Sequence, residues 1–173
     1  MDDFAGDVTT IGVLDVDGTA SGELEAVGDD DWFALNVEAG DLVSISLDGI
    51  TLSDPFLRLH DANGNQIAFN DDGGPGLNSQ LAFTFDTSGV YYVSARGFAD
   101  SRSGTYQLSA TLIEDDFAGD TSSTGVLEVG GTTTGTVDFE GDSDFFAIEL
   151  TAGEIVRIAS DGGFDTNLSL IHI

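Results

Sequence analysis

The chain has 173 residues, of which 40% are hydrophobic, enough to bury the core of one or two small domains. It carries 32 Asp and Glu against 4 Arg and no Lys, a formal net charge of −28, which argues against nucleic acid or anionic membranes as partners because little can neutralise their phosphates. The lack of Lys excludes a Walker-type phosphate loop, and the lack of Cys excludes disulfides and thiolate metal sites.

Two explanations of the acidity stay open, namely solubility and the binding of hard cations by oxygen ligands. Because many acids cluster in short loops, we favour cation binding for those clusters. No apolar run approaches the length of a membrane span, so we expect no membrane insertion. No basic-then-apolar signal follows Met1, so we expect Met1 to lie at a fragment boundary.

Short segments of alternating apolar and polar residues, separated by turn-forming residues, follow one another along the first two thirds of the chain. In residues 31–37, for example, the alternation places Phe33, Leu35 and Val37 on one face of a strand. The expected strands include residues 31–37, 41–47, 56–60, 66–70, 81–85, 90–95 and 105–112. With no helical period of useful length, the pattern predicts an all-β fold, an antiparallel β-sandwich of jelly-roll type.

The chain repeats itself with an offset of 113 residues. The motif "DDFAGD" stands at Asp2–Asp7 and again at Asp115–Asp120, and the offset holds without a gap as far as Asp161. After a shortening by two residues, "DPFLRL" matches "DTNLSL". We therefore expect one complete copy in residues 1–113 and an incomplete second copy, with about five strands, in residues 114–173.

Comparison of the copies separates acids that recur from acids that do not. The turn "GDDDWF" of copy one becomes "GDSDFF" in copy two, so Ser143 replaces Asp30 while its acidic neighbours recur. Adjacent carboxylates repel one another and cost stability unless a positive charge lies among them. The acids that recur as Asp include Asp2, Asp3, Asp7, Asp29, Asp31 and Asp48.

The ordered motifs resemble those of the bacterial pre-peptidase C-terminal (PPC) domain family. They include "DDFAGD", "DWFAL", "LSDPFLRLHDANGNQIAFNDDGG" and "GVYYVSARGF", and the resemblance covers copy one and the first half of copy two. It implies a jelly-roll sandwich that accompanies the catalytic domain of a secreted bacterial protein. Collagenase relatives imply calcium (Ca²⁺), held between an acidic N-terminal segment and an Asp-rich turn before an aromatic strand.

This resemblance assigns candidate calcium ligands in both copies. In copy one the N-terminal segment matches Asp2, Asp3 and Asp7, and the turn matches Asp29 and Asp31. In copy two the matching acids are Glu114, Asp115, Asp116, Asp120, Asp142 and Asp144. The collagenase relatives begin with a Glu-rich segment that copy one does not have, so we expect the first site to lack one or more ligands.

Other readings of these features stay open. The acidic turn can be a solvated loop of a very acidic protein. A second loop, "NDDGG", offers Asp71 and Asp72 to a second cation or forms a flexible turn. "DANGN" lacks the spacing of an EF-hand loop and predicts a hairpin turn. Trp32 is a candidate sugar-stacking platform, although packing is the better expectation because copy two has Phe145 there.

Catalysis is not expected. A Ser-His-Asp triad requires His60 or His172, and no "GxSxG" motif is present. We expect a non-catalytic, calcium-binding accessory module of a secreted bacterial protein, with a hydrolase as the parent, that stabilises, spaces or targets a catalytic domain. The alternative is a carbohydrate- or surface-binding adhesive repeat whose partner is an extracellular protein or polysaccharide. A small glycosidase is the third hypothesis, because acids are abundant.

Overall fold

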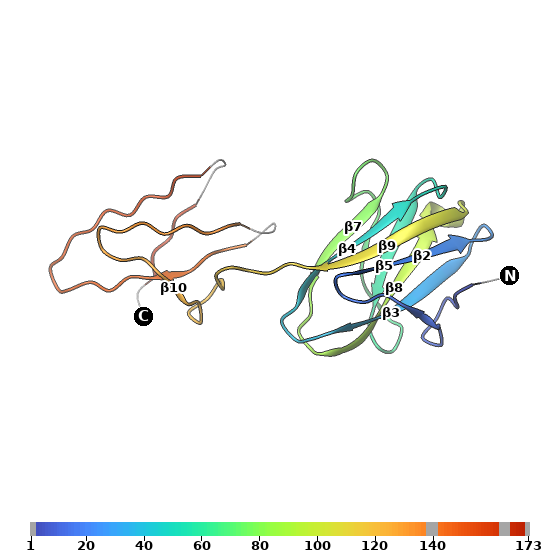
Figure 1. Cartoon of the computed structure of the whole chain (residues 1–173), viewed down its shortest axis with the longest axis horizontal. Coiled ribbons are helices and arrows are strands. Elements are labelled where there is room, and N and C mark those ends of the chain that lie inside the picture. Colours follow the sequence, from blue (N-terminus) through green and yellow to red (C-terminus); the bar gives the residue numbers. More distant parts are fainter. Residues whose placement is uncertain (1–2, 138–141, 163–166, 172–173) are drawn as a thin grey trace. The chain divides into compact units, whose positions relative to one another are not determined.

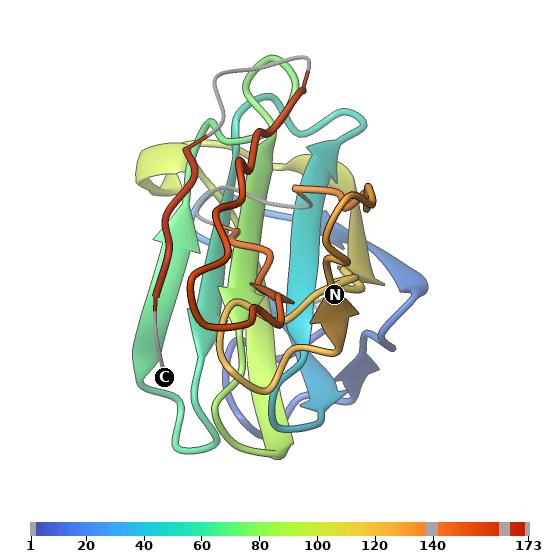
Figure 2. The same ribbon diagram turned by 90° about the vertical axis from the view of Figure 1, so that its left-hand side faces the viewer.

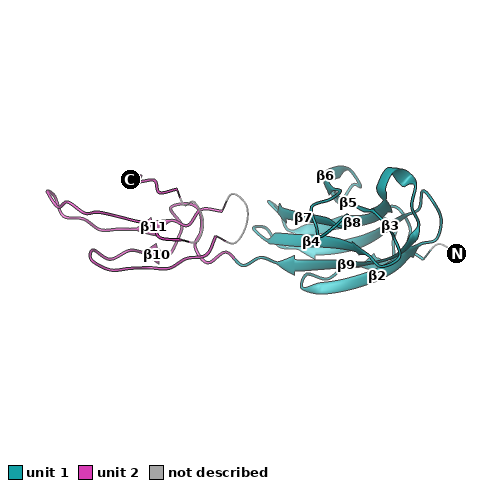
Figure 3. Cartoon of the chain, turned by 90° about the horizontal axis from the view of Figure 1, so that it is seen from above, with its two compact units in different colours: residues 1–114 teal, residues 115–173 magenta. Residues whose placement is uncertain are grey.

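The structure is a computed structural model that describes residues 3–137, 142–162 and 167–171. The chain divides into two compact units, Met1–Glu114 and Asp115–Ile173, which are coloured separately in Figure 3. Each unit is described by itself. No helix among the described residues is long and apolar enough to cross a membrane.

Unit 1 is a sandwich of two β-sheets (Figure 1). One sheet has the order β1-β3-β8-β5-β6 and the other β2-β9-β4-β7. The strands are β1 (Gly12–Val13), β2 (Gly18–Leu24), β3 (Asp30–Val37), β4 (Leu42–Gly49), β5 (Pro55–His60), β6 (Gln66–Asn70), β7 (Ser79–Thr84), β8 (Gly89–Gly97) and β9 (Gly104–Leu112). From β2 onward the chain changes sheet at every step except the β5–β6 hairpin. This order is that of a jelly roll, so the predicted fold is confirmed.

One pairing differs from the expected antiparallel arrangement. β1 runs parallel to β3, with Gly12 opposite Phe33. The intervening β2 lies in the other sheet, so the chain returns to β3 by a crossover, and a crossover permits parallel pairing. Thr10 extends this contact, because its hydroxyl donates to the carbonyl of Trp32 at 2.6 Å. The N-terminal segment is therefore attached to the edge of the sheet.

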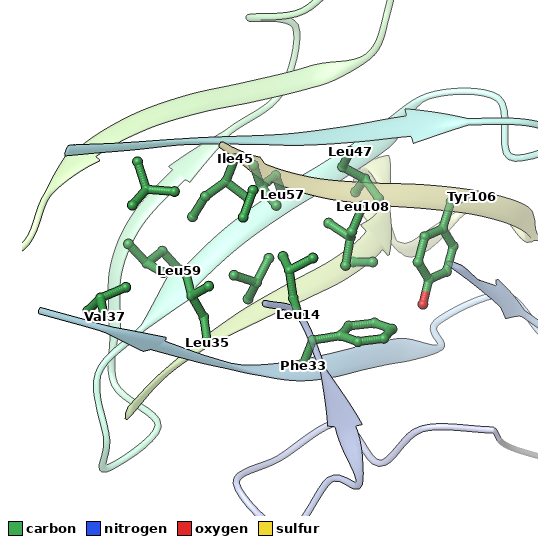
Figure 4. Close-up of a cluster of buried hydrophobic side chains, with 14 of the residues drawn as sticks. Leu14, Phe33, Leu35, Val37, Ile45, Leu47, Leu57, Leu59, Tyr106 and Leu108 are labelled. Atoms are coloured by element: carbon green, nitrogen blue, oxygen red, sulfur yellow. The ribbon is translucent and has the colours of Figure 1, made fainter. Parts of the chain in front are cut away.

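The core lies between the two sheets and follows the predicted alternation. Phe33 and Leu35 of β3 face Ile45 and Leu47 of β4, and all four side chains are almost fully buried. Figure 4 shows this cluster, with Phe33 and the ring of Tyr106 at one end of it. Burial of such side chains stabilises the sandwich by about 25 cal/mol per Å² of apolar surface.

The outer face of the β3–β8–β5 sheet carries a second aromatic group. Trp32 stacks on His60 with 3.9 Å between the ring centroids, and Tyr92 packs beside them. The Tyr92 hydroxyl donates to the carbonyl of Val8 at 3.3 Å, so the N-terminal segment lies against this group. Trp32 therefore packs within the unit, as expected from its replacement by Phe145 in copy two.

Unit 2 forms much less regular structure than the sequence predicts. In the described part of Asp115–Ile173, the strands are β10 (Gly125–Val126) and β11 (Phe146–Ala147), which pair in parallel (Figures 2 and 3). Gly125 opposite Phe146 is the counterpart of Gly12 opposite Phe33 in unit 1. The expectation of about five strands is therefore not met in the described part of unit 2, where most of the expected segments are unpaired.

We expect limited proteolysis to cleave unit 2 first and to leave unit 1 as a stable fragment. Unit 1 has a closed core, whereas Ile155 and Leu170 of unit 2 are exposed and little of its backbone is paired. Mass spectrometry of the fragments over time checks this. Equal resistance of both units in a monomer would contradict it.

Candidate metal centre

Asp31 is a carboxyl group buried at one end of the sandwich. Its side chain is 0% exposed. Its Oδ2 accepts a hydrogen bond from the Tyr106 hydroxyl at 2.6 Å, whereas Oδ1 has no hydrogen-bond partner among the described residues. An ionised carboxylate in such a position is costly unless a cation or further donors compensate it. The free Oδ1 therefore marks a position where a positive ligand fits.

Tyr106 reaches Asp31 from the opposite sheet because Gly22 leaves room for it. Gly22 lies opposite Tyr106 in the β2–β9 ladder, and a Cβ at Gly22 would collide with the Tyr106 hydroxyl. The tyrosine ring also packs edge-on against Phe33, two residues beyond Asp31. The two sheets are thus joined at this end by a polar contact between β3 and β9.

Three further acids surround Asp31. Burial raises the pKa of Asp31 to about 8, the Tyr106 hydrogen bond opposes this rise, and the charges of Asp3, Asp29 and Glu25 add to it. The pKa of Glu25 is raised as well, through desolvation and its contact with Asp29. The Asp29 carboxylate is held in place, because it accepts from the backbone N–H groups of Glu25 and Asp30. The N-terminal segment and the turn thus meet as one acidic cluster.

Phe4 anchors the N-terminal segment at this cluster. Its ring lies 4.6 Å from that of Phe33, which places the neighbouring Asp3 close enough to act on Asp31. The same contact recurs in unit 2, where the Phe117 and Phe146 rings are 4.7 Å apart. The Phe of "DDFAGD" thus has a packing role, and in unit 1 its contact positions the preceding Asp3 near Asp31.

Unit 2 brings together the counterparts of three predicted ligands. Carboxylate oxygens of Asp115, Asp142 and Asp144 lie within 4.8 Å of one another. They correspond to Asp2, Asp29 and Asp31 of copy one, although Asp2 lies outside the described residues. Asp29 and Asp31 of unit 1 therefore have counterparts that lie close together in unit 2.

Other predicted ligands lie elsewhere or have local partners. Asp7 accepts from the backbone N–H and the hydroxyl of Thr9, bonds that lower its pKa, and Asp120 does the same with Ser122. Asp116 accepts from the backbone N–H of Thr136 at 3.0 Å. The remaining candidate, Glu114, is exposed at the end of unit 1. None of these contacts brings its acid to Asp31 or to Asp144.

In the structure, a third acid lies beside the two acids predicted in the second loop. Carboxylate oxygens of Asp54, Asp71 and Asp72 lie within 4.8 Å of one another. Partial burial, then the charges of Asp72 and Asp54, raise the pKa of Asp71. Asp54 also lies 3.9 Å from Arg102, a long and partly exposed ion pair. Three carboxylates, one from the residue before β5 and two from the residues after β6, therefore lie together at the open end of the β5–β6 hairpin.

Sequence reasoning missed Glu25, Asp54 and Tyr106. Two of them had a signal, because their counterparts in copy two, Asp138 and Asp165, are also acidic. A comparison that accepted any acid would have found Glu25, and the match of "DPFLRL" to "DTNLSL" already pairs Asp54 with Asp165. The comparison of the copies gave no signal for Tyr106, because residues 115–173 contain no counterpart of β9.

Tyr106→Phe removes the hydroxyl that donates to Asp31. The free energy of unfolding in the presence of chelator should fall by about 1–3 kcal/mol, because a buried oxygen loses its donor. Urea denaturation measures this. Tyr91→Phe is the control, since its hydroxyl bonds the exposed Thr87. Equal small effects of both substitutions would show that the bond to Asp31 is dispensable.

Asp31 also predicts how the stability of the metal-free protein depends on pH. Its pKa in the folded state, about 8, lies above the ordinary aspartate value of 3.8, so its proton stabilises the folded state at low pH. This stabilisation is lost as pH rises from about 4 to about 8, by at most about 1.4 kcal/mol per pH unit. Asp31→Asn should therefore gain stability relative to the wild type over this range in chelator. A difference between the two proteins that does not vary with pH would contradict the raised pKa.

Comparison with known proteins relates part of unit 1 to a known family. Residues 29–97, from the acidic turn to the end of β8, match the family model described as "Bacterial pre-peptidase C-terminal domain". Among solved structures, the pre-peptidase C-terminal domain of collagenase from Bacillus anthracis is 24% identical, with 57% of this chain and 92% of that chain covered and a TM-score of 0.47.

A periplasmic inhibitor of g-type lysozyme from Aeromonas hydrophila is 14% identical, with 57% and 97% covered and a TM-score of 0.40. No curated protein matches the chain. The family model spans six of the nine strands of the sandwich, including β3 with Asp31. Residues 29–97 of unit 1 therefore match the family that the sequence motifs resemble.

Proposed function

We propose that unit 1 is a non-catalytic accessory module that binds calcium at Asp31. The observation that carries the proposal is the fully buried Asp31 carboxyl group, with one oxygen on Tyr106 and the other without a partner among the described residues. A divalent cation there replaces repulsion among the carboxylates with attraction, and it favours the ionised form of Asp31.

The available donors suit calcium better than zinc or copper. The acids that act on Asp31 are Asp3, Asp29 and Glu25, so the donors are carboxylate oxygens. Calcium accepts six to eight such oxygens in flexible arrangements, together with backbone carbonyls, whereas zinc and copper favour His or Cys ligands. The chain has no Cys, and His60 lies on the outer face of the sheet.

The expected effect of calcium is to fasten the N-terminal segment to the sandwich. Asp3 comes from that segment, Asp29 from the turn before β3, and Asp31 from the start of β3. Binding to the folded state alone stabilises it by about 2.7 kcal/mol when free calcium is about 100 times the Kd. In a chain without disulfides, an ion of this kind supplies the cross-link.

The proposed accessory role is supported by the similarity to this family and by the placement of the histidine. His60 is 5% exposed beneath Trp32, so it is packed rather than presented to a substrate, and His172 lies outside the described residues. The family is named for its association with peptidases. We therefore propose that the module belongs to a secreted bacterial hydrolase and stabilises, spaces or targets its catalytic domain.

Asp31→Asn should reduce the rise in melting temperature that calcium produces, while leaving the metal-free fold intact. The amide keeps the shape of the carboxyl group but removes the charge that a cation requires. Melting curves with calcium and with chelator, at matched ionic strength, measure the rise. The control is Asp86→Asn, which removes the same charge from an exposed side chain. Equal calcium-induced shifts in both variants and the wild type would reject Asp31 as a ligand.

We further propose that the Asp54–Asp71–Asp72 loop binds a second, weaker cation. Its three carboxylates are close together, and like charges at this distance repel unless a cation or protons intervene. Titration calorimetry should lose one class of sites in Asp71→Asn while the site at Asp31 is retained. An unchanged calorimetric stoichiometry would leave this loop as a solvated turn.

The alternative function, binding to an extracellular surface, is favoured by an aromatic patch on the outer face of unit 1. Phe56 stacks on Phe69 and touches Phe98, and Phe69 is 58% exposed. Arg58 lies over the Phe56 ring and makes no ion pair among the described residues. Such a patch suits an acidic polysaccharide or protein. Glycan arrays with wild type and Phe69→Ser test this role separately from calcium.

A further inference from the structure

The outer face of the β5–β6 hairpin holds an arginine that forms no ion pair among the described residues. Arg58 lies opposite Phe69 in the β5–β6 ladder, and its guanidinium carbon is 5.1 Å from the centre of the Phe56 ring. Its Nε is buried and has no hydrogen-bond partner in the described part of the chain. In a chain with 32 acids and 4 arginines, a cation in this state indicates a carboxylate that comes from outside the chain.

The other two arginines of unit 1 are paired. A nitrogen of Arg96 lies 3.6 Å from a carboxylate oxygen of Asp30, and Arg96 also contacts Asp100. A nitrogen of Arg102 lies 3.9 Å from a carboxylate oxygen of Asp54. Arg58 is held by an aromatic ring instead, which keeps its planar guanidinium in one orientation.

Exposed apolar side chains flank Arg58. Phe69 is 58% exposed and stacks on Phe56 with 5.8 Å between the ring centroids. Phe98, which is 41% exposed, packs against the same Phe56 ring at 6.4 Å. Ile67 lies two residues before Phe69, on the same face of β6. We call Phe56, Arg58, Ile67, Phe69 and Phe98 the Arg58 platform.

A strained loop positions one end of this platform. Ala99 and Asp100, which follow Phe98, have φ angles of 51° and 52°, a conformation that is unfavourable for residues other than glycine. The loop is held by the contact of Arg96 with Asp100 and by a hydrogen bond from the Phe98 backbone N–H to the carbonyl of Asp54 at 2.9 Å. Strain of this kind persists only where surrounding contacts hold it, and it is frequent at ligand-binding surfaces.

We propose that the Arg58 platform binds a glycan in which a carboxylated sugar lies beside neutral sugars. The flat apolar face of a sugar ring stacks on Phe69. The carboxylate accepts hydrogen bonds from the guanidinium of Arg58, which lies directly across the ladder from Phe69. The inference rests on the proposed surface-binding role of this patch and names its ligand.

The charge of the chain selects among acidic glycans. The net charge is −28, and the carboxylates of Asp54, Asp71 and Asp72 lie together at the open end of the hairpin that carries the platform. A polysaccharide with a carboxylate on every ring would bring its charges against these acids, and like charges oppose association. An isolated carboxylate among neutral rings pairs with Arg58 and largely avoids this repulsion.

The surroundings of the platform favour a glycan over a protein. A stable protein interface buries about 800 Å² on each partner, so it would extend beyond the platform. It would then cover Asp54, Asp71 and Asp72 at one end of the hairpin or Asp61 at its turn. Removing water from carboxylates that gain no partner is costly. A glycan chain is narrow enough to contact only the rings and Arg58.

The test uses the full chain in chelator, so that no cation bridges the ligand to the acids beside the platform. A glycan array should hold neutral chains, sialylated trisaccharides, chains that alternate glucuronic acid with N-acetylglucosamine, and oligogalacturonate, which has a carboxylate on every ring. We expect glycans with isolated carboxylated sugars to bind more strongly than the neutral chains and oligogalacturonate. The strongest ligand is then measured by calorimetry beside the same glycan with its carboxyl groups reduced to hydroxymethyl groups.

Reduction of the carboxyl group and Arg58→Gln should each weaken binding at least about tenfold, because each removes a charge-assisted pair. Arg58→Lys should restore only part of the affinity, since it keeps the charge but not the planar fork. Phe69→Ser should abolish binding. The control is Arg102→Gln, which removes the same charge from an arginine outside the platform. Melting curves in chelator establish that each variant is folded.

Three results overturn the inference, namely no binding of any carboxylated glycan, equal affinity for the reduced glycan, and equal losses in Arg58→Gln and Arg102→Gln. Binding of a neutral glycan or an acidic peptide that is lost in Phe69→Ser but kept in Arg58→Gln also overturns it, while it retains the proposed surface-binding role. The calcium-induced rise in melting temperature is measured separately, so failure of this inference is distinguishable from failure of the site at Asp31.

Discussion

Both sheets of unit 1 are held together at their centres by strands from the end of the domain. β9 joins β2 to β4 and β8 joins β3 to β5, so the early strands cannot pair until the late ones arrive. The long separation in sequence makes this pairing slow to form and cooperative once formed. The same arrangement determines the candidate metal centre, because β9 carries the tyrosine that reaches Asp31.

The acidic cluster is compatible with this fold because packing and charge act on different residues. Phe4 fastens the N-terminal segment through its contact with Phe33, and this contact brings Asp3 close to Asp31. In the absence of a cation, the raised pKa lets Asp31 remain protonated near neutral pH, which limits the cost of burying it. A cation and a proton therefore compete for the same buried group.

Much of the fold could be predicted from local patterns. The alternation around Phe33 and Leu35 identified the buried face of β3, and "DANGN" identified the hairpin, where Asp61 accepts from the backbone N–H groups of Asn63 and Asn65. The acidic turn and the N-terminal segment were also chosen from the sequence, and the structure places Asp3, Asp29 and Asp31 together. Glu25 was missed because the copies were compared for identical residues rather than for identical charge.

The sequence by itself determined the side of each strand that faces the core, the turns, and the repeat of acids with its anchoring phenylalanine, because these properties depend on neighbouring residues. Only the tertiary structure decided that β1 is parallel to β3, that one oxygen of Asp31 is held by a tyrosine 75 positions away, and that the described part of copy two forms two short strands rather than about five. The physical reason is that strand pairing and the burial of a carboxyl group depend on partners distant in sequence, and a local pattern does not specify whether those partners are present.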